Sequence, residues 1–201
     1  MRSMKSLMQP RRMLQAVLGA VLLASGASTP VLAARGAPVS AILVDAADGT
    51  VLYADNPDRV RAPASLAKMM TLFMAFDAID AGRLRLGDRI VMSRHAAGQA
   101  PTKLGLAPGQ SIRVEDAIRA ITVQSANDVA VALGERLAGN EPAFARQMTR
   151  RAQALGLQHT VFVNASGLPD RRNVTTAHDI LRHLGVPVGK RDYLGPIGRR
   201  E

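Results

Sequence analysis

A long apolar segment that contains one lysine is the feature of this sequence that most limits how the chain can fold. Apolar side chains fall on every side of residues 65–81, which predicts a helix buried within the protein rather than one lying on its surface. Gly82 is suited to end this helix. A charged ammonium is costly to desolvate, so Lys68 must reach water, pair with an anion, or have its pKa lowered until it is often neutral.

Ser65 lies at i−3 from Lys68, on the same face of the predicted helix. A neutral lysine there could take the proton of the serine hydroxyl and leave a nucleophile at the helix N-terminus, where backbone N–H groups favour negative charge. The alternative is that Ser65 caps the helix and Lys68 extends its ammonium into water. Taken alone, the pair favours this simpler interpretation, because both residue types are common.

A second polar motif, Ser125-Ala126-Asn127, separates two segments with helical periodicity, residues 115–124 and 128–137. It places a hydroxyl and a carboxamide on a short turn between rigid elements. It also has a structural interpretation, because Ser125 and Asp128 form a capping-box-like pair that would start the second helix.

Together, the two motifs resemble the first two active-site motifs of the penicillin-recognising serine enzymes. The flanking sequence is similar to the serine-type D-alanyl-D-alanine carboxypeptidases of the low-molecular-mass penicillin-binding proteins. The similarity covers about residues 39–180, in "ILVDAADGTVLYADNPDRVRAPASLAKMMTLFMAFDAI", "TKLGLAPGQSIRVEDAIRAITVQSANDVAVALGERLAG" and "FVNASGLPDRRNVTTAHDI". The resemblance implies that Ser65 is the acylated nucleophile and Lys68 its base. It further implies that Ser125 relays a proton and that Asn127 contacts the substrate's amide.

The resemblance also implies a substrate, a fold and a set of partners. The substrate would be the D-Ala-D-Ala end of a peptidoglycan stem peptide, and β-lactam antibiotics would act as acylating inhibitors. The implied fold is the α+β architecture of β-lactamases and transpeptidases, with an antiparallel sheet packed against helices and a helical subdomain. The nucleophile would lie at the junction of these parts. No metal and no organic cofactor are implied.

The sequence departs from this family at its third motif, because no Lys-Thr-Gly triplet occurs in the 201 residues. Lys103-Leu104-Gly105 precedes Ser125, and Gly189-Lys190-Arg191 lacks the hydroxyl and the final glycine. In the family that strand contacts the terminal carboxylate and supplies an oxyanion donor, and losing one such donor typically slows turnover about a hundredfold to a thousandfold. We therefore expect a C-terminally truncated domain whose later strands are missing and whose activity is weak or absent.

Two alternatives stay open. One is a non-catalytic remnant that binds cell wall weakly. The other is a β-lactamase, which the absence of a Glu-x-x-Leu-Asn pattern disfavours.

Residues 1–33 have the pattern of a cleaved export signal. Basic residues precede an apolar stretch at about 13–25, and small residues at Val31-Leu32-Ala33 suit a signal peptidase. The stretch is too short to span a bilayer comfortably, so we expect membrane association only if the signal stays uncleaved. The mature protein is expected to begin at Ala34 and to reach the periplasm or the extracellular cell-wall space.

Composition narrows the classes further. The net charge is +10 and falls to +6 without the four basic residues of the signal, with no block of like charges that would form a nucleic-acid patch. The absence of cysteine excludes a disulfide framework. The four histidines, which show no zinc-protease pattern, are His95, His159, His178 and His183.

The remaining elements complete the expected domain, residues 34–184. Residues 39–45 and 51–54 alternate around an Asp-Gly turn and predict a hairpin. Periodicity predicts further helices at 141–155 and 176–184 and a short strand at 160–164. Residues 185–201, rich in Gly, Pro and Arg, predict an unstructured or aberrant tail.

Overall fold

The computed structural model describes residues 39–45 and 51–185. The chain divides into two compact units, Met1–Pro38 and Val39–Glu201, and every described residue belongs to the second. The predicted signal peptide, the turn at 46–50 and the segment after residue 185 lie outside the described residues. No helix within the described ranges is both long and apolar enough to cross a membrane.

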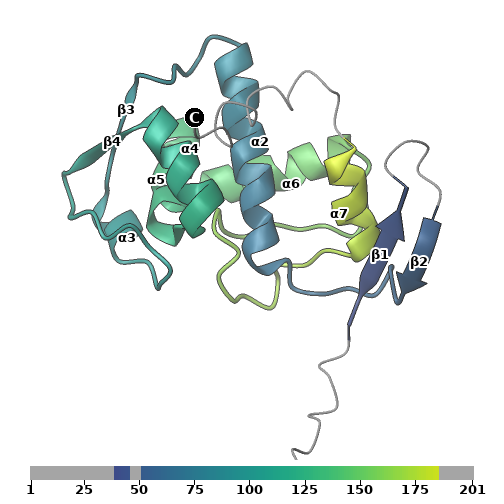
Figure 1. The fold of residues 1–201 in the computed structure, drawn as a ribbon. Coiled ribbons are helices and arrows are strands. Elements are labelled where there is room, and N and C mark those ends of the chain that lie inside the picture. The colour runs from purple at the N-terminus through teal and green to yellow at the C-terminus, as the bar shows by residue number, and fades with distance from the viewer. Residues whose placement is uncertain (1–38, 46–50, 186–201) are drawn as a thin grey trace, which may run out of the picture. The chain divides into compact units, whose positions relative to one another are not determined.

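Four helices form the main core. They are α2 (Ala67–Asp80), α4 (Val114–Gln124), α5 (Asn127–Ala138) and α6 (Glu141–Ala154). Helix α5 packs against α2, α4 and α6, and α2 also contacts α6. Figure 1 shows α2 at the centre of this arrangement, with α4 and α5 on one side and α7 (Ala177–Leu184) on the other.

Helix α2 is buried on several sides, as its sequence predicts. Met70, Phe73 and Phe76 are all buried in the main core cluster. The first turn of the predicted helix is a 3-10 turn, η1 (Ala64–Leu66), and Gly82 follows the helix with a φ of +69°. The predicted range of 65–81 is therefore confirmed, except that its start is wound more tightly.

Two separate antiparallel hairpins provide the strands. The first pairs β1 (Ala41–Val44) with β2 (Val51–Asp55) and confirms the predicted hairpin. The second pairs β3 (Arg89–Val91) with β4 (Ser111–Arg113), and between these strands lies α3 (Arg94–Ala97). The sequence did not predict the second hairpin or α3, because three or four residues are too few to show a period.

The predicted strand at 160–164 is wrong. Val161 makes only an isolated bridge with Val174. The hydroxyl of Thr149 on α6 accepts from the N–H of Phe162 at 2.9 Å and donates to its carbonyl at 3.0 Å. Because this side chain occupies both backbone groups, Phe162 has none left for a strand ladder.

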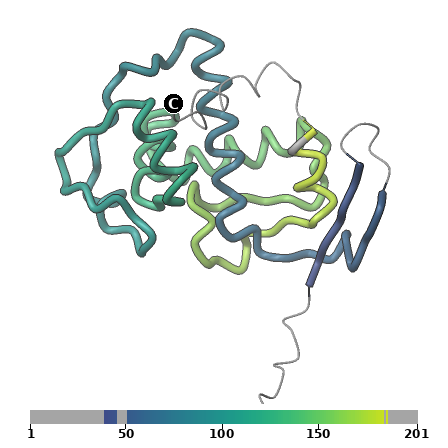
Figure 2. Tube along the Cα trace, in the orientation of Figure 1, coloured from purple at the N-terminus to yellow at the C-terminus, as the bar shows by residue number. Residues whose placement is uncertain are grey.

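The segment after α6 returns to the beginning of α2. Figure 2 shows residues 157–175, green to yellow, passing the N-terminal end of α2. Arg61 and Thr175 exchange backbone hydrogen bonds of 2.8 Å in both directions. Thr176 then caps α7 by accepting from the N–H of Asp179 at 3.0 Å, which confirms the predicted helix at 176–184.

Candidate active site

Ser65 lies in the 3-10 turn just before α2, and its side chain is exposed. The preceding residue, Ala64, has a left-handed backbone with φ +47°. Gly167 packs directly against this turn, because a Cβ built there would lie 1.7 Å from the carbonyl oxygen of Ala64. Gly167 also has φ +80°, so glycine is required twice over, by its conformation and by its close contact.

Lys68 lies in the first turn of α2 and is only 4% exposed. Its Nζ donates to the carbonyl oxygen of Ser166 at 2.7 Å and lies 3.5 Å from Ser65 Oγ. Burial lowers its pKa from 10.5 to about 8. About a tenth of the molecules would therefore carry a neutral Lys68 at pH 7, far more than for an ordinary lysine.

This geometry contradicts the simpler interpretation of the Ser-x-x-Lys pair. Neither η1 nor α2 has a side-chain cap, so Ser65 does not act as one. Lys68 does not extend its ammonium into water, because the whole residue is buried. The two side chains instead face each other at the surface of the core.

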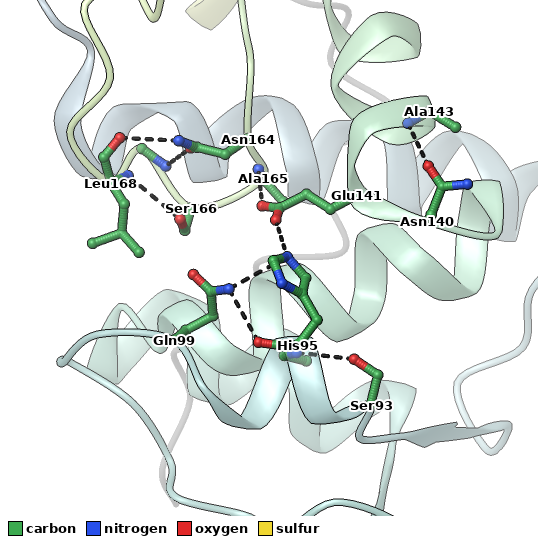
Figure 3. Close-up of polar contacts among 12 residues, drawn as sticks. Ser93, His95, Gln99, Asn140, Glu141, Ala143, Asn164, Ala165, Ser166 and Leu168 are labelled. Carbon is green, nitrogen blue, oxygen red and sulfur yellow. Dashed lines mark hydrogen bonds and ion pairs between the residues drawn. The ribbon is translucent and has the colours of Figure 1, made fainter.

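The loop of residues 164–168, Asn-Ala-Ser-Gly-Leu, holds Lys68 from the other side. Its turn is closed by Asn164, which accepts from the N–H of Gly167 at 2.7 Å and donates to the carbonyl of Leu168 at 3.0 Å (Figure 3). The hydroxyl of Thr71, one turn beyond Lys68, donates to the carbonyl of Ala165 at 2.7 Å. Helix α2 therefore binds two successive carbonyls of this loop.

Sequence reasoning assigned no role to this loop or to Thr71. One local signal was available, because Thr71 lies at i+3 from Lys68 and is a second polar residue within an apolar helix. The partner of Lys68, a backbone carbonyl 98 residues away, leaves no trace in the sequence around either residue.

Ser125 lies between α4 and α5 in a left-handed conformation, with φ +56°. Its carbonyl accepts from the hydroxyl of Thr102 at 3.1 Å. The N-cap of α5 is Ala126, and no side chain caps that helix, so the capping-box interpretation is wrong. The turn is instead held by contacts with the loop of residues 100–105.

Asn127 is almost fully buried at the start of α5. Its Nδ2 donates to the carbonyl of Ala100 at 2.9 Å, and its backbone N–H donates to the carbonyl of Thr102 at 2.8 Å. The carboxylate of Asp128 accepts from the N–H groups of Leu104 and Gly105 at 2.9 and 2.8 Å. The loop of residues 100–105 is therefore fixed to the turn that carries Ser125.

The structure joins two of the four predicted site residues directly. Ser65 and Lys68 are in contact, whereas no hydrogen bond among the described residues links Ser125 or Asn127 to either of them. The elements that carry the two motifs do pack together, since α2 contacts α5. Lys103 points elsewhere, with its Nζ 3.4 Å from the carbonyl of Ala97, and Lys190 lies outside the described residues.

In the part of the chain that the structure describes, neither a metal cluster nor a pocket along α2 coincides with the predicted site residues. Within the described residues, no group of three or more metal-binding side chains is close enough to hold an ion. A pocket of about 350 Å³ lies farther along α2. It is lined by Met74, Asp77, Arg83, Leu137, Gln147, Arg150, Arg151 and Ala154, which include none of the predicted site residues.

Comparison with known proteins gives consistent matches. The sequence profile of a family described as D-alanyl-D-alanine carboxypeptidase matches residues 26–191. The D-alanyl-D-alanine carboxypeptidase DacF of Bacillus subtilis is 35% identical over 141 residues, which cover 70% of this chain and 36% of that protein. The chain thus spans little more than a third of the length of this relative.

Solved structures of similar proteins share the fold. The D-alanyl-D-alanine carboxypeptidase DacD from Francisella tularensis matches with a TM-score of 0.69 and 32% identity, over 80% of this chain and 38% of that one. Penicillin-binding protein D2 from Listeria monocytogenes, in its ampicillin-bound form, matches with a TM-score of 0.65 and 29% identity, over 78% of this chain and 61% of that one. These matches confirm the predicted α+β fold class.

Proposed function

Because the chain belongs to the D-alanyl-D-alanine carboxypeptidase family, peptidase family S11, we propose that it carries the nucleophile and the base of a serine-type D-Ala-D-Ala carboxypeptidase. The substrate is the D-Ala-D-Ala end of a peptidoglycan stem peptide. One observation carries the proposal: a buried lysine whose pKa is lowered to about 8 contacts an exposed serine at the start of a helix. The match covers only 36% of the length of the Bacillus subtilis relative. The proposal is therefore limited to the site that contains Ser65 and Lys68.

The proposed reaction begins with the neutral form of Lys68. Its Nζ takes the proton of the Ser65 hydroxyl as Oγ attacks the carbonyl carbon of the penultimate D-alanine. The present 3.5 Å separation shortens in the substrate complex, as catalytic hydrogen bonds often do. An ester bond then forms between Ser65 and the shortened stem, while the peptide C–N bond breaks.

The proton next goes to the leaving group. Ser125 relays it from the Lys68 ammonium to the amine of the departing D-alanine, and Asn127 binds the amide of the substrate. Water then hydrolyses the ester and restores Ser65. Support for these two roles is the packing of α5 against α2 and the rigid turn that the loop of residues 100–105 holds.

β-Lactam antibiotics would acylate Ser65 by the same route. The support comes from penicillin-binding protein D2 of Listeria monocytogenes, which was solved in an ampicillin-bound form and has the same fold. When Ser65 attacks the lactam carbonyl, the ring C–N bond breaks and the amine stays attached to the acyl group, so this reaction needs the nucleophile and the base but no departing D-alanine.

Fluorescent penicillin tests the proposal on the full chain. Wild type should be labelled, and the rate should rise with pH through about 8, where Lys68 loses its proton. Ser65→Ala and Lys68→Ala should abolish the label, whereas the matched variants Ser111→Ala, in β4, and Lys103→Ala, on the surface, should keep it. Label that persists in Ser65→Ala would remove this residue as the nucleophile.

Release of D-alanine from an N-acylated Lys-D-Ala-D-Ala peptide separates turnover from binding. Turnover should be far slower than in a relative that carries a Lys-Thr-Gly strand, because this sequence holds no such triplet. Labelling without any release would favour the alternative of a non-catalytic penicillin binder. Loss of turnover in Lys103→Ala would instead give that lysine part of the third motif's role.

The proposed function also includes export. Residues 1–33 would be removed as a signal peptide, and the remaining protein would act in the periplasm or the extracellular cell-wall space. N-terminal sequencing of the processed protein should begin at Ala34. An intact Met1 would contradict this part of the proposal.

A further inference from the structure

The ammonium of Lys68 depends on one short hydrogen bond for its orientation. Among the described residues its close partner is the carbonyl of Ser166 at 2.7 Å, while Ser65 Oγ lies at the outer limit of 3.5 Å. A lysine side chain has several rotatable bonds, so a single fixed acceptor decides where its nitrogen lies. The position of the Ser166 carbonyl therefore controls how Lys68 faces Ser65.

The residue before Ser166, Ala165, is held at both of its backbone polar groups. The N–H of Ala165 donates to Glu141 Oε1 at 3.0 Å, and the carbonyl of Ala165 accepts from the Thr71 hydroxyl at 2.7 Å. All these groups are buried, so water does not compete with the contacts. The Glu141 carboxylate thus contacts the backbone one residue before the carbonyl that binds Lys68.

Glu141 is the first residue of α6, but its side chain does not serve that helix alone. The cap of α6 is Asn140, whose Oδ1 accepts from the N–H of Ala143 at 2.9 Å. Figure 3 shows the Glu141 side chain between the loop of residues 164–168 and His95 on α3. Its second oxygen, Oε2, lies 2.5 Å from His95 Nε2.

His95 is itself supported by residues on either side of α3. The side chain of Gln99 donates to the carbonyl of His95 at 3.1 Å, and Ser93 caps α3 by accepting from the N–H of Ala96 at 2.9 Å. The contacts therefore run without a break from α3 through Glu141 and Ala165 to the base on α2.

We propose that Glu141 is a positioning residue for the base: through the N–H of Ala165 it holds the Ser166 carbonyl against the nitrogen of Lys68. The inference rests on the proposed function only in taking Lys68 as the base. A carboxylate buried to 7% exposure is costly unless it is hydrogen-bonded, and here each oxygen has a partner. A purely structural Glu141 would join α3, α6 and the loop without orienting the Ser166 carbonyl.

The two roles predict opposite changes in the pKa of Lys68. Among the described residues no charged side chain shifts this pKa, and burial alone lowers it. The Ser166 carbonyl accepts from the charged form and so stabilises it. If Glu141 only positions this carbonyl, its removal lowers the pKa further below about 8. If Glu141 only holds the fold together, its removal admits water and raises the pKa towards 10.5.

The test is an NMR titration of the full chain with labelled lysine side chains. The sequence has only four lysines, and the exposed Lys103 serves as an internal reference. Glu141→Ala should lower the pKa of Lys68. Glu141→Gln keeps an oxygen that can accept from Ala165 N–H, so it should stay near wild type. Glu115→Ala, which removes a surface carboxylate paired with Arg119, is the matched control and should leave the pKa of Lys68 unchanged.

Acylation by fluorescent penicillin gives a second readout. Misplacement of the base in Glu141→Ala should slow labelling by up to about a hundredfold, with Glu141→Gln restoring most of the rate. If Glu141→Ala does not fold, Thr71→Val removes the other contact to Ala165 at nearly constant shape and should lower the same pKa.

The outcomes separate the two proposals. A Lys68 pKa that is unchanged or rises in folded Glu141→Ala, or a Glu141→Gln variant as impaired as Glu141→Ala, overturns the positioning role. A wild type that penicillin does not label defeats the proposed function. Even then, a lower Lys68 pKa in Glu141→Ala than in wild type would still support the positioning role.

Discussion

The first hairpin and helix α2 contain similarly apolar residues but differ in how they are buried. In β2, Val51, Leu52 and Tyr53 are each more than half exposed, and Leu52 reaches 60%. In α2, Met70 is fully buried. Successive strand residues point to opposite faces, so both faces of β2 are open, whereas α2 is covered by α5, α6 and the loop of residues 164–168.

The difference shows which structure the described residues can complete by themselves. A helix satisfies its backbone internally and needs only apolar neighbours, which α5 and α6 supply. A two-stranded hairpin is marginal until further strands or a helix cover it. Ser65 and Lys68 belong to the packed part, so their geometry does not depend on whether other elements cover β1 and β2.

Gly167→Ala tests the packed part with the largest expected effect. The new Cβ would overlap the Ala64 carbonyl in the turn that carries Ser65. We expect the free energy of unfolding to fall by about 4 kcal/mol or more, and penicillin labelling to be lost as well. Urea denaturation measures the loss. Gly139→Ala is the matched control, because it also has a positive φ but meets nothing within 4 Å, and it should cost about 1–2 kcal/mol. Equal losses would mean that conformation alone, rather than contact, requires Gly167.

Truncating one apolar side chain in each region tests the comparison itself. Met70→Ala should cost about 2–5 kcal/mol because it leaves a cavity in the core. Leu52→Ala should change stability by no more than about 0.5 kcal/mol, because its side chain already faces water. Denaturation midpoints of the two variants supply the numbers. A large loss in Leu52→Ala would show that β2 is covered in solution and break the comparison.

The pH dependence of stability reports on the burial of Lys68. Its pKa is near 10.5 when unfolded and about 8 when folded, so the unfolded state binds more protons between these values. Stability should therefore rise with pH from about 8 to about 10.5 and show the full penalty, about 3 kcal/mol, below pH 8. Lys68→Met should remove this slope, as seen in urea unfolding at several pH values. A slope that survives in Lys68→Met belongs to another group.

Removal of a helix cap should cost less than any of the losses expected from the packed core. Asn140→Ala removes the acceptor for the N–H of Ala143 at the start of α6 and should cost about 1 kcal/mol. Asn140→Asp keeps the acceptor and should cost little. Thermal unfolding distinguishes the two. A larger loss in Asn140→Ala, accompanied by a changed Lys68 pKa, would show that the cap also holds Glu141 in place.

Local patterns were enough to find the five longer helices, α2, α4, α5, α6 and α7, and the Ser65–Lys68 pair. The period of 3.6 residues places positions 65 and 68 on one face, and Gly82 follows α2 with a positive φ, as its place in the sequence suggested. The same reasoning failed at residues 160–164, because a side chain from α6 takes the backbone groups that a strand would use. It also missed Glu141, whose contacts with His95 and Ala165 join residues 46 and 24 positions apart.

Sequence by itself therefore determined that residues 65–81 form a buried helix and that a serine and a lysine share its first turn. It stated the problem of a buried lysine without choosing among water, an anion and a lowered pKa. The tertiary structure decided this point, because other helices enclose α2. The carbonyl of Ser166, 98 residues from Lys68, accepts a hydrogen bond from the ammonium. Desolvation depends on everything packed around a group, so the shifted pKa of Lys68 belongs to the folded chain rather than to any local pattern.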